Sequence, residues 1–120
     1  MQRLLRIALA ALTFTTAEAT AHAHLKVSSP AAEATVPVAP TEVTITFTEA
    51  LEGNLSRISI KDGAGTPVDG GDTHVVAGGD NKTLAVSVKG LAAGTYRVDW
   101  SAASVDTHKT TGSFQFTIKP

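Results

Sequence analysis

Apolar and polar side chains alternate with a period of two residues along most of this chain. Successive side chains of an extended strand point to opposite faces, so this period indicates half-buried β-strands. Residues 25–28 form a further candidate strand, and residues 73–77 form a weak one, which brings the expected number to about seven. The apolar positions of the five clearest strands are Val43, Ile45 and Phe47; Ile58 and Ile60; Leu84, Val86 and Val88; Tyr96, Val98 and Trp100; and Phe114, Phe116 and Ile118.

Turn-forming residues separate these strands, and no sustained 3.6-residue pattern is found beyond the first 21 residues. Asp62-Gly63, Gly78-Gly79 and similar pairs are typical of tight turns. Short strands at this spacing predict an all-β fold, a two-sheet sandwich or Greek-key barrel of immunoglobulin-like shape. We expect Trp100 to pack between the sheets.

The composition excludes several classes of site. The chain has no Cys, which removes disulfides, zinc ribbons, iron–sulfur clusters and the blue-copper type of centre. Ten Lys and Arg against eleven Asp and Glu give a formal net charge of -1, so there is no basic field for nucleic acid. The only Met is Met1.

Residues 1–21 have the features of a secretory signal peptide. Arg3 and Arg6 precede a short apolar run at residues 7–14, and a small-residue stretch follows. The run is about half the ~20 residues of a membrane-spanning helix, so we expect export without a membrane anchor. Cleavage after Ala21 gives a domain of residues 22–120, and the alternative is cleavage after Ala23. The mature protein then begins with His22 or with His24.

An N-terminal histidine is a candidate metal ligand. Its amine and its imidazole can bind one ion together, and both lose their proton readily near neutral pH. If His22 comes first, His24 is third, and its imidazole can join the amine and the intervening amide on a square-planar ion. Such tetragonal nitrogen and oxygen donor sets suit Cu(II). The competing interpretation is that both histidines are remnants of a cleavage site with no role.

Two Asp-Thr-His tripeptides offer further ligands. In an extended strand, residues i and i+2 point to the same side, so Asp106 and His108 could face one ion. Asp72 and His74 follow a Gly-Gly pair, and we interpret them as plain surface residues. For the Asp106 pair, the surface interpretation is about as good as the ligand interpretation.

Several motifs together resemble the CopC family of periplasmic copper-binding proteins (copper resistance protein C). They are His22-Ala23-His24-Leu25-Lys26, Ser29-Pro30-Ala31, Phe47-Thr48-Glu49, residues 93–100, Ser104-Val105-Asp106-Thr107-His108-Lys109 and Gly112-Ser113-Phe114. The resemblance runs from residue 22 to residue 119.

The resemblance implies a Greek-key β-barrel of the cupredoxin or immunoglobulin-like kind with one N-terminal Cu(II) site. The family's ligands correspond to His22, Asp106 and His108, with Glu49 nearby and His24 used in members that begin His-x-His. Some members also carry a Met-rich Cu(I) site, which needs soft thioether donors. Because no Met follows Met1, we expect no Cu(I) site here.

The function expected from this resemblance is a periplasmic, non-catalytic carrier or buffer of Cu(II) in copper homeostasis and resistance. Its partner would be an inner-membrane copper importer or another periplasmic copper protein, and we expect a monomer. Two alternatives remain open. One is an oxidative enzyme with a copper brace, and the other is a metal-free immunoglobulin-like interaction module.

Overall fold

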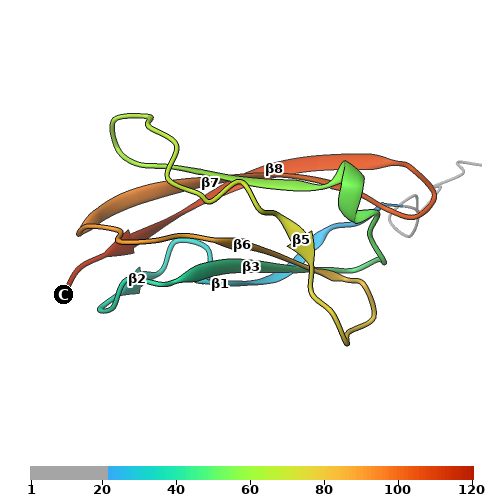
Figure 1. The fold of residues 1–120 in the computed structure, drawn as a ribbon, viewed down its shortest axis with the longest axis horizontal. Helices are drawn as coiled ribbons and strands as arrows, with labels where there is room; N and C mark the ends of the chain where they lie inside the picture. Colours follow the sequence, from blue (N-terminus) through green and yellow to red (C-terminus); the bar gives the residue numbers. More distant parts are fainter. Residues whose placement is uncertain (1–21) are drawn as a thin grey trace, which may run out of the picture.

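A computed structural model describes residues 22–120, and the expected signal peptide at residues 1–21 lies outside the described residues. Strands β1 (Leu25–Ser29), β3 (Glu42–Phe47), β6 (Thr83–Ser87) and β5 (His74–Val75) form one sheet in that spatial order. Strands β2 (Thr35–Val36), β8 (Lys109–Ile118), β7 (Gly94–Ala103) and β4 (Arg57–Lys61) form the other. The two sheets stack as layers (Figure 1), which confirms the predicted all-β sandwich.

The period-two pattern is produced by burial between the layers. In β3, Val43, Ile45 and Phe47 are fully buried, whereas the alternate residues Thr44 and Thr46 are only partly covered. The expected position of Trp100 is also confirmed. Its ring on β7 meets the ring of Phe47 on β3 edge to face, with ring centroids 5.1 Å apart, so it joins the two sheets.

Strands β7 and β8 are longer than the apolar pattern predicted. They pair antiparallel over ten residue pairs, from Gly94 opposite Ile118 to Ala103 opposite Lys109. Strand β2 was not predicted. It has two residues, lies beside Pro37, and runs parallel to β8, so neither its length nor its composition gives a periodic signal.

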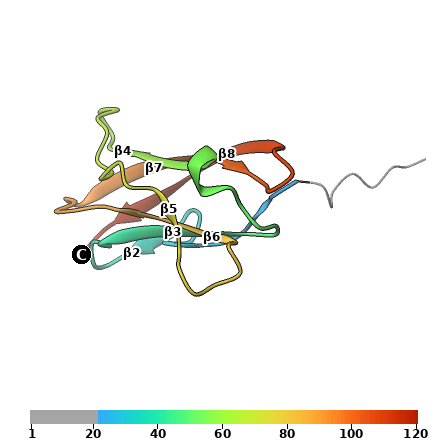
Figure 2. The ribbon, with the colours of Figure 1, turned by 45° about the vertical axis from the view of Figure 1, so that its right-hand side comes forward.

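One end of the sandwich gathers several segments that are distant in the sequence. The start of the described chain, the segment after β3 and the β7–β8 turn lie at this end, and the C-terminus lies at the other (Figures 1 and 2). A 3₁₀ turn, η2 (Gly53–Leu55), follows β3 at the same end. This end therefore brings together the start of the described chain and the turn that carries Asp106 and His108.

A substitution of Gly112 should show how tightly Trp100 packs. The two residues face each other across the β7–β8 ladder, and a Cβ atom on Gly112 would lie 2.5 Å from Cζ2 of Trp100. We expect Gly112→Ala to lower the free energy of unfolding by about 1–3 kcal/mol through overpacking. Urea unfolding of the metal-free protein would measure the change.

Gly63→Ala is the matched control, because a Cβ atom there would meet nothing within 4 Å. Equal stabilities of the two variants would contradict the proposed close packing at Gly112.

Candidate metal centre

The turn between β7 and β8 carries the Asp106-Thr107-His108 sequence. Two backbone hydrogen bonds close it: the Ser104 N–H donates to the His108 carbonyl at 3.0 Å, and the Thr107 N–H donates to the Ser104 carbonyl at 2.8 Å. Thr107 has a φ of 71°, in the left-handed region that β-branched residues rarely adopt. The turn is therefore held in one tight conformation.

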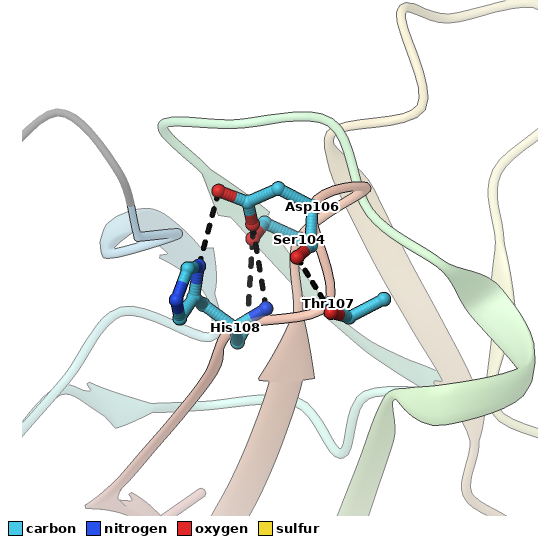
Figure 3. Close-up of polar contacts among 4 residues, drawn as sticks. All are labelled: Ser104, Asp106, Thr107 and His108. Atoms are coloured by element: carbon cyan, nitrogen blue, oxygen red, sulfur yellow. Dashed lines mark hydrogen bonds and ion pairs between the residues drawn. The ribbon is translucent and has the colours of Figure 1, made fainter.

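The Asp106 carboxylate is the centre of a small hydrogen-bond network (Figure 3). Its Oδ1 accepts hydrogen bonds from the Ser104 hydroxyl and from the His108 N–H at 3.3 Å, and its Oδ2 lies 3.1 Å from Nδ1 of His108. The Ser104 hydrogen bond, followed by those from His108, lowers the pKa of Asp106 to about 2. This half-exposed side chain is therefore an anion at neutral pH.

The network also fixes the chemistry of His108. A carboxylate can only accept hydrogen bonds, so the Nδ1 that faces Asp106 carries the ring proton. In the neutral ring, the other nitrogen, Nε2, then has a free lone pair. A carboxylate that holds one ring nitrogen while the other binds a metal is a common arrangement of metal-ligating histidines.

The His22 ring lies against the His108 ring. Their centroids are 4.8 Å apart, and the ring planes are nearly perpendicular, at 82°. The Nδ1 atom of His22 is buried and has no hydrogen-bond partner, which is true of no other buried side-chain nitrogen or oxygen in residues 22–120. Leaving a buried polar atom unpaired costs roughly 1–3 kcal/mol. This nitrogen is thus placed to gain from a ligand.

The segment that carries His22 is held between the two sheets. The Ala23 side chain is fully buried in the core cluster, and the Ala23 carbonyl accepts a hydrogen bond from the Thr110 hydroxyl of β8 at 2.5 Å. The His24 N–H donates to Oγ1 of Thr48 at 3.0 Å, and the Thr48 N–H donates to the His24 carbonyl at 2.9 Å. These contacts set the position of the ring before them.

The structure brings three of the five expected site residues together: His22, Asp106 and His108. The His24 side chain is exposed, and Glu49 is partly covered beside Thr48. In the described part of the chain, no group of three or more His, Asp or Glu side chains is arranged closely enough to enclose a metal ion. The candidate site therefore consists of the imidazoles of His22 and His108, with the Asp106 carboxylate bonded to the second of them.

The second tripeptide is organised differently, in keeping with its interpretation as a surface feature. Oδ1 of Asp72 accepts a hydrogen bond from the Ser87 N–H at 2.9 Å, which together with the Ser87 side chain lowers the pKa of Asp72. Nδ1 of His74 lies 2.8 Å from the backbone carbonyl of Asp72. The Asp72 carboxylate thus fixes the loop to β6, and it does not contact the His74 ring as Asp106 contacts the His108 ring.

Sequence reasoning gave no role to three hydroxyl residues of this end: Ser104, Thr48 and Thr110. Ser104 is 3% exposed and supports Asp106, while the two threonines hold the segment that carries His22. The only available signal was that Ser104 precedes Asp106 by two residues, at a spacing that allows a local hydrogen bond.

Among the described residues, no helix has the length and apolar character that crossing a bilayer requires. The sequence matches the CopC domain family over residues 25–119. It is 40% identical to "Protein YobA" of Escherichia coli K12 over 122 residues, which covers 98% of this chain and 96% of that protein. It is 39% identical to "Copper resistance protein C" of Pseudomonas syringae pv. tomato, covering 84% of this chain and 85% of that protein.

Solved structures give the same relationship. The crystal structure of PcoC, described as a methionine-rich copper resistance protein from Escherichia coli, superposes with a TM-score of 0.69 at 36% identity. The match covers 82% of this chain and 99% of that one. Sequence and fold agree over nearly all of the described domain, and the chain belongs to the CopC family, among whose members are copper resistance proteins.

Proposed function

We propose that this chain is an exported, non-catalytic protein that binds one Cu(II) ion between His22 and His108 and carries or buffers it in the periplasm. The observation that carries the proposal is the buried, unpaired Nδ1 of His22 beside the His108 ring. A bound metal ion would satisfy that nitrogen, whose burial is otherwise unfavourable.

Cleavage after Ala21 would complete the donor set. In the intact chain the main-chain nitrogen of His22 is a peptide nitrogen, and after cleavage it is an amine. The amine and Nδ1 of the same histidine close a six-membered ring on a metal ion, and Nδ1 is the nitrogen without a partner. The burial of Ala23 supports this register, because cleavage after Ala23 would remove both a core side chain and His22.

In the proposed site His108 supplies Nε2, and Asp106 orients its ring from the other side. The Asp106 carboxylate adds a negative charge that favours a divalent cation, since its pKa of about 2 keeps it ionised. Glu49 adds a second carboxylate at the same end. The His24 side chain is exposed, so its imidazole is accessible to a partner.

The donor atoms favour Cu(II) over Cu(I). The mature domain has neither Cys nor Met, so it offers no thiolate or thioether, which are the donors that Cu(I) prefers. In this respect it differs from PcoC, which is described as methionine-rich. We therefore propose one oxidation state on this protein, with transfer to an importer or to another periplasmic copper protein.

The oxidative-enzyme alternative needs a face that binds substrate next to the metal, commonly an aromatic one. The chain has one Trp and one Tyr. Trp100 packs on Phe47, and Tyr96 is 5% exposed and stacks on Phe116. The Tyr96 ring is therefore not available as a platform, and the Trp100 ring is half-buried against Phe47, so the carrier interpretation is favoured.

Adding one glycine before His22 should weaken Cu(II) binding by at least the about 10-fold that loss of a supporting group costs a metal site, because the His22 nitrogen would become an amide that binds a metal only after losing its proton. A competition titration against a chelator of known affinity would measure the change, with protein that starts at His22 as the reference.

His108→Ala should cause a loss of similar size, and His74→Ala serves as the matched control because His74 lies on β5 and its ring contacts the backbone carbonyl of Asp72. Equal losses from His108→Ala and His74→Ala would place the copper site elsewhere.

Cu(II) affinity should fall by more than tenfold between pH ~7 and ~5, because amines and imidazoles must be unprotonated to bind a metal. Asp106 takes up no proton itself in this range, since its pKa of about 2 keeps it charged throughout. Asp106→Asn should lower the affinity throughout this range, because the charged carboxylate beside His108 is lost at every pH. Affinity unchanged down to pH ~4 would contradict an imidazole and amine site.

A further inference from the structure

One peptide group in the N-terminal segment is held from both sheets at once. The carbonyl of the Ala23–His24 peptide accepts a hydrogen bond from Thr110, which belongs to β8. The N–H of the same peptide donates to Thr48, which directly follows β3. Because a peptide group is planar and rigid, these two hydrogen bonds fix its orientation.

The residue before this peptide bond adds a third restraint. The Ala23 methyl is fully buried among the side chains of the core cluster. The Thr48 N–H also bonds the His24 carbonyl at 2.9 Å, which continues the β1–β3 pairing toward the chain start. Rotation of the Ala23–His24 peptide would therefore break its two hydrogen bonds, while the buried methyl and the bond to the His24 carbonyl restrain the residues on either side of it.

The sequence leaves open whether the backbone amides and the His24 imidazole bind the ion, and these restraints favour one answer. A free peptide that begins His-Ala-His can bind Cu(II) with its amine, its backbone amide nitrogens and the third-position imidazole in one plane. That arrangement requires the His24 amide to lose its proton and turn its nitrogen to the metal. In this structure the same N–H is directed at Oγ1 of Thr48.

We propose that Thr48 and Thr110 are positioning residues that keep the His24 backbone amide off the copper ion. The ion is then held by the amine and ring of His22 and by His108, and the His24 imidazole is left outside the chelate. This inference rests on the proposed Cu(II) site. It extends that proposal, because two hydroxyl side chains that bind no metal would determine which atoms of the N-terminal segment bind the ion.

A carrier must load and release its ion repeatedly, and this ligand set allows that without a change in the fold. Binding through the deprotonated His24 amide would require its hydrogen bond to Thr48 to break at each loading and re-form at each release. Binding through an amine and two imidazoles leaves the backbone hydrogen bonds intact, so the ion can enter and leave without local unfolding.

The decisive experiment compares the visible absorption and electron paramagnetic resonance spectra of two Cu(II) complexes. One is the protein that starts at His22. The other is the free pentapeptide His-Ala-His-Leu-Lys, which has the same first five residues but lacks the hydrogen bonds from Thr48 and Thr110. Amide nitrogens are strong-field donors, so we expect the d–d band of the peptide complex at shorter wavelength than that of the protein complex. Identical spectra would overturn the inference.

The variant Thr48→Val/Thr110→Val removes both hydroxyls and keeps the side-chain shapes. Its Cu(II) spectrum should move toward that of the pentapeptide, and amide exchange at His24 in the metal-free variant should accelerate about 10-fold or more, since the hydrogen bond to Thr48 is lost. Unchanged spectra and exchange would overturn the inference. The single variants carry the same test if the double variant does not fold.

Thr95→Val is the matched control. The Thr95 hydroxyl also makes a hydrogen bond, to Thr117 at 3.0 Å, but at the opposite end of the β7–β8 ladder. It should leave the spectrum and the exchange rate unchanged. If the protein that starts at His22 binds no Cu(II), the proposed function fails. If it binds Cu(II) with the spectrum of the peptide, only the positioning role fails.

Discussion

The long antiparallel ladder of β7 and β8 is the constraint on which the copper end depends. Its ten consecutive residue pairs fix which side chains face inward and where the turn falls. Because side chains alternate with a period of two, a slip of one residue would send Trp100 outward and move Thr110 away from the gap between the sheets. The same register places Gly112 beneath the Trp100 ring and His108 at the end of the hairpin.

The other half of the site comes from a segment that is far away in sequence. Ala23 and Thr110 are 87 residues apart, so their hydrogen bond forms only when the sandwich has closed. The burial of the Ala23 methyl joins this segment to the same core as Phe47 and Ile58. The proximity of His22 to His108 is therefore a property of the whole fold, and an unfolded chain or a short peptide lacks it.

The sequence predicted those parts of the protein that burial decides. Alternating apolar residues correctly predicted β3, β4, β6 and those halves of β7 and β8 that lie away from their connecting turn, because half-buried strands must alternate. The halves next to the turn consist of polar or small residues, which give no apolar alternation. Their strand structure is therefore seen only in the pairing of β7 with β8. Asp106 and His108 were expected to meet as strand neighbours, yet they meet in a turn, through hydrogen bonds to Ser104 and a left-handed Thr107. The hydroxyl contacts of Thr48 and Thr110 depend on tertiary closure, which no local pattern encodes.

The unpaired Nδ1 of His22 connects the stability of the fold to its proposed cargo. Burying this nitrogen without a partner costs the metal-free protein roughly 1–3 kcal/mol, and the buried Ala23 and the two threonine hydrogen bonds hold it there nevertheless. A ligand that binds only the folded state also raises the stability of that state. The atom that weakens the empty fold is therefore the one through which copper would strengthen it.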